Sequence, residues 1–320
     1  MYYILKKEDL HKFINLLKDE FEVIAPVRKN DSLIFDKISS SDEIVTKYIN
    51  TDYPPKDFFL ESTLYSYEKN KHVKLHNENK INKRVIYGIR PCDVNALLKL
   101  DKIFCGEEYY RIRRQNTKII AITCNESGDN CFCTSFGTDH LSSGFDLLFT
   151  DTGKEFYIKV GSDWGRSIVK NKLFRKAEKH FKRVFIECER FFLLSGISKK
   201  LEEIFKTDKF NKYFKKCLSC SACSVVCPLC YCFDIVHRPE LKNKGKVEKI
   251  LSSCLLKEFT RIGGNHVFRE DRVERYKQYL GHKFIYSKKQ YRDYLCVGCG
   301  RCISHCPVDI DFEKLFEEVL

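Results

Sequence analysis

The spacing of apolar positions changes several times in the first 160 residues, which predicts a mixture of helices and strands. One apolar stripe at helical spacing predicts an amphipathic helix over residues 1–20. Its members are Leu10, Phe13, Ile14 and Leu17. A second helix is expected over 91–104, where a proline and an aspartate suit the first turn. Runs rich in β-branched and aromatic residues predict strands at 21–27, 32–38, 84–89 and 117–123.

Residues 145–160 are predicted to form a hairpin, because the turn residues of 151–153 separate two apolar runs. From residue 162 onward the strand pattern fades. Helical periodicity with dense Lys and Glu predicts helices over 172–194 and 198–214, and 247–279 is expected to be mostly helical. The chain therefore changes from mixed α and β to mainly helical, and the boundary is placed near residue 200.

Two cysteine strings in the last third of the chain add a specific chemistry. The pattern C-x2-C-x2-C-x3-C-P, which is typical of bacterial 4Fe–4S proteins, occurs twice. Where two clusters are present, the fourth cysteine of each string ligates the other cluster. This crossed assignment gives a first cluster bound by Cys217, Cys220, Cys223 and Cys306. The second cluster is then bound by Cys296, Cys299, Cys302 and Cys227.

Zinc is the alternative metal for these cysteine strings, because C-x2-C pairs also build structural zinc sites. Zinc leaves the two Cys-Pro endings and the duplicated third spacing unexplained. Together with the periodicity, the strings predict an α+β chain. A mixed α/β domain is expected over residues 1–200, followed over 201–320 by a mainly helical, ferredoxin-like domain with two 4Fe–4S clusters.

Four cysteines of the N-terminal domain suggest a third metal site. Cys92 follows one predicted strand and Cys124 follows another, so both are expected at the carboxyl end of one sheet. Cys131 and Cys133 lie on a nearby loop, and a set of four thiols suits another 4Fe–4S cluster. Asp93 is an alternative ligand. The competing explanation is ordinary buried cysteine, which packs as a small hydrophobic residue.

The remaining cysteines are interpreted as structural. Cys230, Cys232 and Cys254 form a rival set near the first string, but they lack an obvious fourth cysteine, so the sequence does not favour a cluster there. Cys105 and Cys188 have no partner at a ligand spacing.

Composition and charge narrow the class of protein. With 320 residues, 43% hydrophobic and 32% charged, the chain suits a soluble protein of two or more domains. Its formal charge of +13 falls to about +9 if each oxidised cluster with its thiolates removes about 2. That balance is consistent with an acidic or nucleotide-bearing neighbour, or with a lysine-rich background alone. The basic residues are scattered without a recognition motif, which argues against nucleic-acid binding.

The expected location is the cytoplasm. The chain begins without the apolar region of a signal peptide, and its most apolar run, 191–197, is too short to span a membrane. In a reducing compartment, seventeen cysteines favour metal ligation over disulfides.

Several motifs resemble those of one family, in the same order along the chain. They are Gly88-Ile-Arg-Pro-Cys-Asp93, Asn130-Cys-Phe-Cys-Thr-Ser135, Gly144–Leu148, Gly263-Gly264 with Phe268-Arg269, and Cys296–Cys302. The chain is similar to the iron–sulfur beta subunits of sulfhydrogenases, which are NAD(P)-linked nickel–iron hydrogenases, and more distantly to the A subunit of anaerobic sulfite reductase. The resemblance implies a cluster in the N-terminal domain. In one departure, Ile235 stands where some relatives have a further cysteine, which weakens a cluster on Cys230 and Cys232.

The predicted function is an iron–sulfur electron-transfer subunit without a catalytic site of its own. The resemblance implies that it relays electrons between two partners, a flavin-binding NAD(P)H subunit on one side and a catalytic subunit on the other, of hydrogenase type first and sulfite reductase type next. No Gly-x-Gly-x-x-Gly motif is present, so the chain is not expected to bind a dinucleotide. The alternatives are a self-contained iron–sulfur reductase with a substrate pocket in the N-terminal domain, and a redox-sensing regulator.

Overall fold

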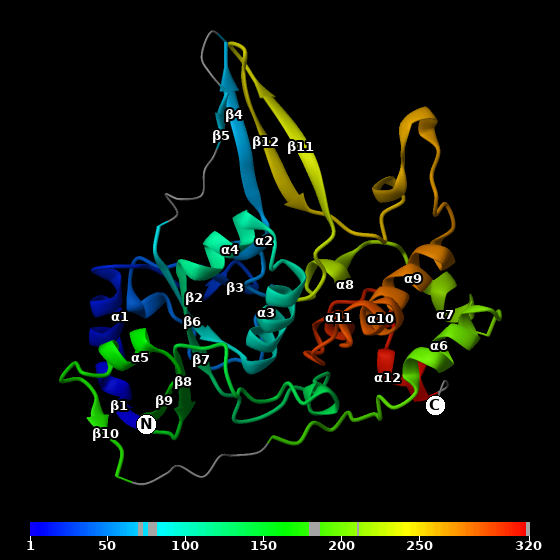
Figure 1. Cartoon of the computed structure of the whole chain (residues 1–320). Helices are drawn as coiled ribbons and strands as arrows, with labels where there is room; N and C mark the ends of the chain where they lie inside the picture. The colour runs from blue at the N-terminus through cyan, green and yellow to red at the C-terminus, as the bar shows by residue number, and fades with distance from the viewer. Residues whose placement is uncertain (70–72, 76–81, 179–185, 210, 318–320) are drawn as a thin grey trace.

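An eight-stranded mixed sheet forms the centre of the N-terminal part. The structure is a computed structural model, and it describes residues 1–69, 73–75, 82–178, 186–209 and 211–317 (Figure 1). The strand order is β10-β1-β9-β8-β7-β6-β2-β3. The bounds are β1 Tyr2–Lys6, β2 Glu22–Lys29, β3 Ser32–Lys37, β6 Arg84–Ile89, β7 Thr117–Ile122, β8 Leu147–Asp151, β9 Glu155–Val160 and β10 Arg175–Lys176. The inner strands β2, β6, β7 and β8 run parallel to one another, and the outer strands are antiparallel to their neighbours.

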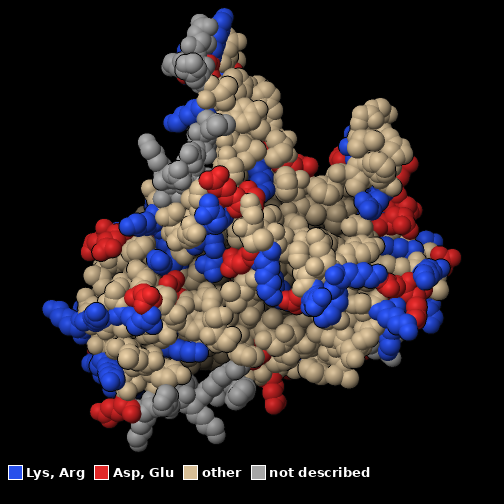
Figure 2. Space-filling view, in the orientation of Figure 1, with Lys and Arg blue, Asp and Glu red and all other residues tan. Residues whose placement is uncertain are grey.

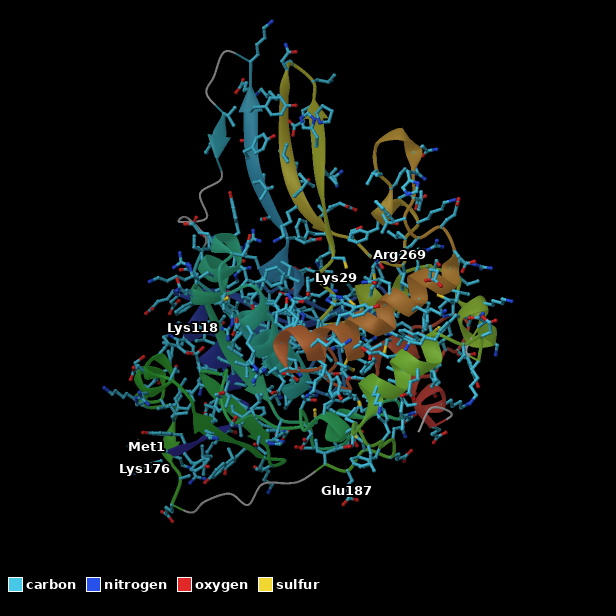
Figure 3. The ribbon with its side chains drawn as sticks, turned by 45° about the vertical axis from the view of Figure 1, so that its right-hand side comes forward. Met1, Lys29, Lys118, Lys176, Glu187 and Arg269 are labelled. Carbon is cyan, nitrogen blue, oxygen red and sulfur yellow. The ribbon has the colours of Figure 1, made fainter. Side chains whose placement is uncertain are left out.

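Helices cover both faces of this sheet, as parallel strands require. The elements are α1 Leu10–Lys18, α2 Asp57–Leu60, α3 Pro91–Ile103, α4 Glu108–Gln115 and α5 Asp163–Ile168. Val85 and Tyr87 of β6 share a core with the apolar residues of α1, whereas Ile86 and Ile89 share the other core with those of α2, α3 and α4. The alternation of side chains along β6 therefore supplies two cores. The start of β1 lies beside β10, where Tyr3 pairs with Lys176. Figure 3 labels Met1 and Lys176 next to each other.

A bulge at the end of β6 directs the chain toward the N-terminal cysteines. The register with β7 shifts between Tyr87 and Ile89, and Gly88 has φ +89°. A Cβ at Gly88 would lie 2.8 Å from the Tyr48 hydroxyl and 3.0 Å from Pro26. Only glycine fits this bend without strain. The bend leads directly into α3, which carries Cys92 in its first turn.

A second sheet of four antiparallel strands projects from the body of the molecule (Figure 1). Its order is β11-β12-β4-β5, with bounds β4 Ser62–Glu68, β5 Lys74–Leu75, β11 Phe233–Glu240 and β12 Lys244–Leu251. Because β4 pairs with β12, the two predicted domains contribute to one sheet. A division near residue 200 stays a prediction.

The C-terminal part contains short helices around an aromatic core. They are α6 Ile197–Phe205, α7 Asn211–Lys216, α8 Ala222–Val225, α9 Arg272–Gly281, α10 Ser287–Tyr291, α11 Arg301–Ser304 and α12 Phe312–Glu317. A π-helical turn, His282–Tyr286, joins α9 to α10. Short 3-10 turns occur at Lys7–Asp9, Ser41–Glu43, Cys133–Phe136, Glu258–Thr260 and Gly263–Asn265. Phe214, Tyr276, Leu280 and Phe284 are buried in the core that these helices share.

The structure confirms most predicted elements of the N-terminal part and corrects others. The four predicted strands correspond to β2, β3, β6 and β7, the hairpin to β8 and β9, and the second helix to α3. The prediction of one helix over 1–20 is wrong for Tyr2–Lys6, which forms a strand because β9 offers it an edge. In the described residues of 172–194 the structure has no helix.

The expectation of a mainly helical second domain is not confirmed, because β11 and β12 occupy 233–251 except for their turn. In β12, alternate residues are buried, among them Gly245, Val247 and Lys249. Its lysine-rich composition conceals this period-two pattern. The mixed α/β character of the chain as a whole is as predicted.

Candidate metal centres

Each cysteine string folds into the same tight loop. Two residues per loop have left-handed backbone conformations, at equivalent positions: Ser219 and Ser221 with φ 55° and 66°, and Gly298 and Gly300 with φ 62° and 76°. In each loop the backbone N–H two residues after the first cysteine donates to its sulfur, from Ser219 to Cys217 (3.3 Å) and from Gly298 to Cys296 (3.4 Å). Such bonds stabilise thiolate ligands and tune the potential of a cluster.

The first predicted set of cysteines lines one hollow. The strings approach each other through α8 and α11, which are in contact. Cys217, Cys220, Cys223 and Cys306 line a hollow of about 390 Å³ that is partly open to solvent. Cys302 of the second string lines the same hollow, so the structure brings the two strings together here, and the crossed assignment of Cys306 stays a prediction.

The second predicted set lies deeper. Cys227 and Cys299 are buried, and Cys296 and Cys302 are half-buried. Burial raises the pKa of the Cys302 thiol, and the neighbouring charges of Cys299, Cys296 and Cys227 raise it further.

Lys283 lies against the second set. Its ammonium is 3.0 Å from the Cys227 sulfur and 3.3 Å from the carbonyl oxygen of Leu295, and the residue is only 4% exposed. A hydrogen bond with Cys230 and the charge of Lys283 hold the pKa of the Cys227 thiol well below its ordinary value, although burial opposes this. Cys227 is therefore favoured as a thiolate, the form in which cysteine binds iron.

The spread of the thiols argues against single zinc ions. A zinc ion holds its sulfur ligands at about 2.3 Å, so the ligands must converge on one point. In the part of the chain that the structure describes, no group of three or more His, Cys, Asp or Glu side chains is placed to hold one metal ion. Cluster ligands bind separate iron corners of a larger core and need not converge on one point.

The four N-terminal cysteines also line one hollow. Cys92 lies in the first turn of α3, Cys124 follows β7, and Cys131 and Cys133 lie on the loop before β8. Together they line a partly open hollow of about 350 Å³. The carboxyl ends of β6 and β7 and the following loop bring these thiols together, as the sequence predicts.

Asp93, the alternative ligand, is engaged elsewhere. Its carboxylate accepts two hydrogen bonds from the Arg301 guanidinium, at 2.6 and 2.7 Å. The two side chains are 1% and 2% exposed. Arg301 also donates to the carbonyl oxygen of Thr51 at 2.7 Å. This buried ion pair joins α3 of the N-terminal part to α11 of the second string.

Sequence reasoning missed one thiol at the N-terminal hollow. The Cys188 sulfur lies 3.6 Å from the Cys133 sulfur. Their hydrogen bond lowers the pKa of the Cys188 thiol to about 5. No motif spacing marks Cys188, and it lies where the periodicity predicted a helix, so only the fold could show this proximity.

The second set lies between the other two sets. Cys299 lines the N-terminal hollow, and Cys302 lines the hollow of the first set. The Cys131 thiol is 3.8 Å from the carbonyl oxygen of Cys299, and Asn50 donates to that oxygen at 2.8 Å. The Phe132 N–H donates to the carbonyl oxygen of Gly298 at 2.8 Å. The three sets of thiols therefore form a continuous series.

The comparisons with known proteins identify the class and the family of the chain. Residues 216–310 match the family model of a 4Fe-4S dicluster domain, which defines the class as an iron–sulfur protein. The whole chain is 31% identical over 337 aligned positions to sulfhydrogenase 2 subunit beta of Pyrococcus furiosus, covering 99% of this chain and 98% of that protein. The chain belongs to the family of sulfhydrogenase beta subunits, and it is an iron–sulfur electron-transfer subunit, as its motifs predict.

A second relative is more distant. The F420-dependent formate dehydrogenase subunit beta of Methanocaldococcus jannaschii is 24% identical over 174 residues, which cover 51% of this chain and 38% of that protein. No solved structure matches the chain significantly. None of the helices in the described residues is both long and apolar enough to cross a membrane.

Proposed function

We propose that this chain relays single electrons within a cytoplasmic oxidoreductase complex of hydrogenase type, with a flavin-binding NAD(P)H subunit on one side and a catalytic subunit on the other. Two 4Fe–4S clusters in the C-terminal part and a third in the N-terminal part carry the electrons. When bound, such clusters supply one-electron redox chemistry. The residues of the chain ligate the clusters, keep water away from them and donate N–H groups to their sulfur atoms.

The observation that carries this proposal is the order of the three thiol sets. Each end set is in contact with the middle set, through Cys299 on one side and Cys302 on the other. A continuous series of redox centres is what a relay needs, whereas an isolated structural metal site needs no neighbour.

The first set is the end of the series that is accessible to a partner protein. Cys220 is exposed, and the adjacent Leu218 and Val225 are 54% and 48% exposed. An apolar rim beside a cluster suits a protein–protein contact through which electrons pass. The visible face of the molecule carries Lys and Arg interspersed with Asp and Glu (Figure 2), so we do not assign the partner from charge.

The test is the iron content of the anaerobically prepared chain. These three clusters account for about 12 irons, and an iron content that Cys131→Ser leaves unchanged would argue against the N-terminal cluster. Cys131→Ser should lower the content by about 4 irons and leave the signals of the other clusters on reduction. A content of about 4 would contradict the crossed pair itself.

A self-contained reductase is the second candidate, because two hollows lie beside Cys124. They have volumes of about 740 and 790 Å³ and include Tyr157 and His140 on one side and Tyr48 and Arg90 on the other. Open α/β sheets bind ligands at the carboxyl ends of their parallel strands, and Cys124 follows β7 there. The relay predicts that the isolated chain does not oxidise NAD(P)H with artificial acceptors, whereas robust activity would favour the reductase.

A further inference from the structure

Cys232 and Cys254 are held together at the base of a hairpin. Cys232 immediately precedes β11, and Cys254 lies shortly after β12. The pairing of Phe233 with Leu251, and a hydrogen bond of 2.7 Å from the Ser252 N–H to the carbonyl oxygen of Cys232, fix the two segments side by side. The thiols of Cys232 and Cys254 share a hydrogen bond. Strand pairing therefore brings together two thiols that no local spacing connects.

A third thiol completes this set. Cys230, Cys232 and Cys254 line one hollow of about 330 Å³. The hollows of the first set and of the N-terminal set measure about 390 and 350 Å³, so the space is of the same order. His282, at the start of the π-helical turn, lines the same hollow; its Nε2 atom forms a 3.0 Å hydrogen bond with the Tyr231 hydroxyl, so Nδ1 is the nitrogen left for a ligand role.

Positive charge surrounds this hollow. Lys283 lines it and is 4% exposed, and Lys56 is 3% exposed. The Lys56 ammonium donates to the carbonyl oxygens of Cys230 at 3.0 Å and Ser224 at 2.9 Å. Burying an ammonium costs several kcal/mol of unfolding free energy unless negative charge accompanies it. Thiolates bound to a metal would supply such charge beside both lysines.

Ile235, which replaces a cysteine of some relatives, does not argue against a cluster in this hollow. Ile235 lies on β11 and is 54% exposed, and it is not among the residues that line the hollow. A cysteine at its position is therefore not a missing ligand of this hollow. Cys227 stays with the second set in the crossed assignment, and its sulfur lies 3.0 Å from the Lys283 ammonium.

We propose that Cys230, Cys232 and Cys254 bind a further iron–sulfur cluster, with His282 as the candidate fourth ligand. A cluster suits this set better than one zinc ion, since no three described donors converge on a point. The hydrogen bond between Cys230 and Cys227 places the site directly beside the second set. If the second cluster passes one electron to the proposed cluster, the second cluster is oxidised and the proposed cluster is reduced, and no other reactant is needed.

The experiment compares iron and acid-labile sulfide in anaerobically prepared full-length variants. Cys232→Ser and Cys254→Ser should each lose about 4 irons and about 4 sulfides relative to the unmodified chain. Cys105→Ser, which alters an exposed cysteine, should lose none. Unchanged iron in both variants, or the loss of one zinc instead, would overturn the proposal. Loss of the crossed clusters in Cys306→Ser is a separate result and tests only the relay.

A second measurement needs no variant. Crystals of the unmodified chain, measured at the iron absorption edge, should show anomalous density between Cys230, Cys232 and Cys254. Absence of density there, or density that appears only at the zinc edge, would overturn the proposal even if the serine variants do not fold.

Discussion

The two cysteine strings have the same spacing and the same loop conformation, but their surroundings differ. In the first string, serines occupy both left-handed positions, and Cys220 is exposed to solvent. In the second string, glycines occupy these positions. A Cβ at Gly298 would lie 2.4 Å from the Phe132 carbonyl oxygen, and one at Gly300 would lie 2.3 Å from that of Asn130. The comparison teaches that the motif determines ligation, whereas the packing around it determines what each cluster can reach.

Charged side chains lie against the second set of cysteines: the Lys283 ammonium is 3.0 Å from the Cys227 sulfur, and Arg301 precedes Cys302 in the chain. In the first set, the Arg275 guanidinium donates to the Ser219 hydroxyl at 3.2 Å, two residues from Cys217, and Leu218 beside Cys220 is exposed. We therefore expect the second cluster to have the higher reduction potential and the first cluster to be the one that a partner contacts.

The largest effect is expected from Cys306→Ser. The crossed arrangement predicts that the cluster held by Cys217, Cys220 and Cys223 loses a ligand, with a loss of about 4 irons. Brief alkylation followed by mass spectrometry should then find Cys220 labelled more extensively than in the unmodified chain. Cys227→Ser is the matched variant and should affect the other cluster. Labelling confined to Cys296 and Cys299 after Cys306→Ser would contradict the crossed arrangement.

The ion pair between the second string and the N-terminal part should come next. Asp93→Asn leaves the Arg301 guanidinium buried without its counter-charge, because both side chains are at most 2% exposed. Breaking a buried pair costs about 3–5 kcal/mol of unfolding free energy. Arg166→Gln removes an exposed pair with Asp163 and should change this free energy by less than about 1 kcal/mol. Anaerobic unfolding in denaturant measures the free energy of unfolding of both variants. Equal losses would show that the buried ion pair does not stabilise the contact between the two parts.

Gly298→Ala tests the difference in packing directly. The new Cβ meets the Phe132 backbone, and the φ of +62° disfavours any side chain. The expected loss is about 1–3 kcal/mol of unfolding free energy. Ser221→Ala is the control in the first string, because its left-handed backbone (φ +66°) already accommodates a Cβ and its hydroxyl has no hydrogen-bond partner among the described residues; it should cost less than about 0.5 kcal/mol. If both changes cost the same, the two loops do not differ in the way described.

Lys283→Met should give the smallest but most specific change. A positive charge 3.0 Å from the Cys227 sulfur favours the reduced, more negative cluster. Its removal should lower the reduction potential of the second cluster by about 60 mV, which corresponds to a tenfold change for one electron. Lys12→Met is the control, because Lys12 lies on α1 of the N-terminal part, is 58% exposed and forms an ion pair with Asp9 at 2.7 Å. An anaerobic redox titration followed by EPR would show whether only the first variant shifts.

Local patterns predicted what depends on local residues. The buried strands β6 and β7 are almost continuous apolar runs, and α3 begins at Pro91, so their bounds follow from the sequence. The crossed assignment of the cysteines, which rests on spacing alone, stays a prediction. Features that depend on distant residues could not be predicted: Cys188 beside Cys133, and Arg301 beside Asp93. Lys283 lies on the buried face of its helix, four residues after Tyr279 and three after Leu280, where an apolar side chain is the usual choice.

The four-stranded sheet makes the two halves of the chain dependent on each other. Residues 62–68 supply β4, and 244–251 supply β12, which lies between β4 and β11. A truncated C-terminal half would expose the backbone of β12 as an open strand edge, which readily recruits other chains and aggregates. During synthesis β4 can pair with β12 only after most of the polypeptide has emerged, which favours slow folding. Insertion of the iron–sulfur clusters would then follow, rather than precede, the joining of the halves.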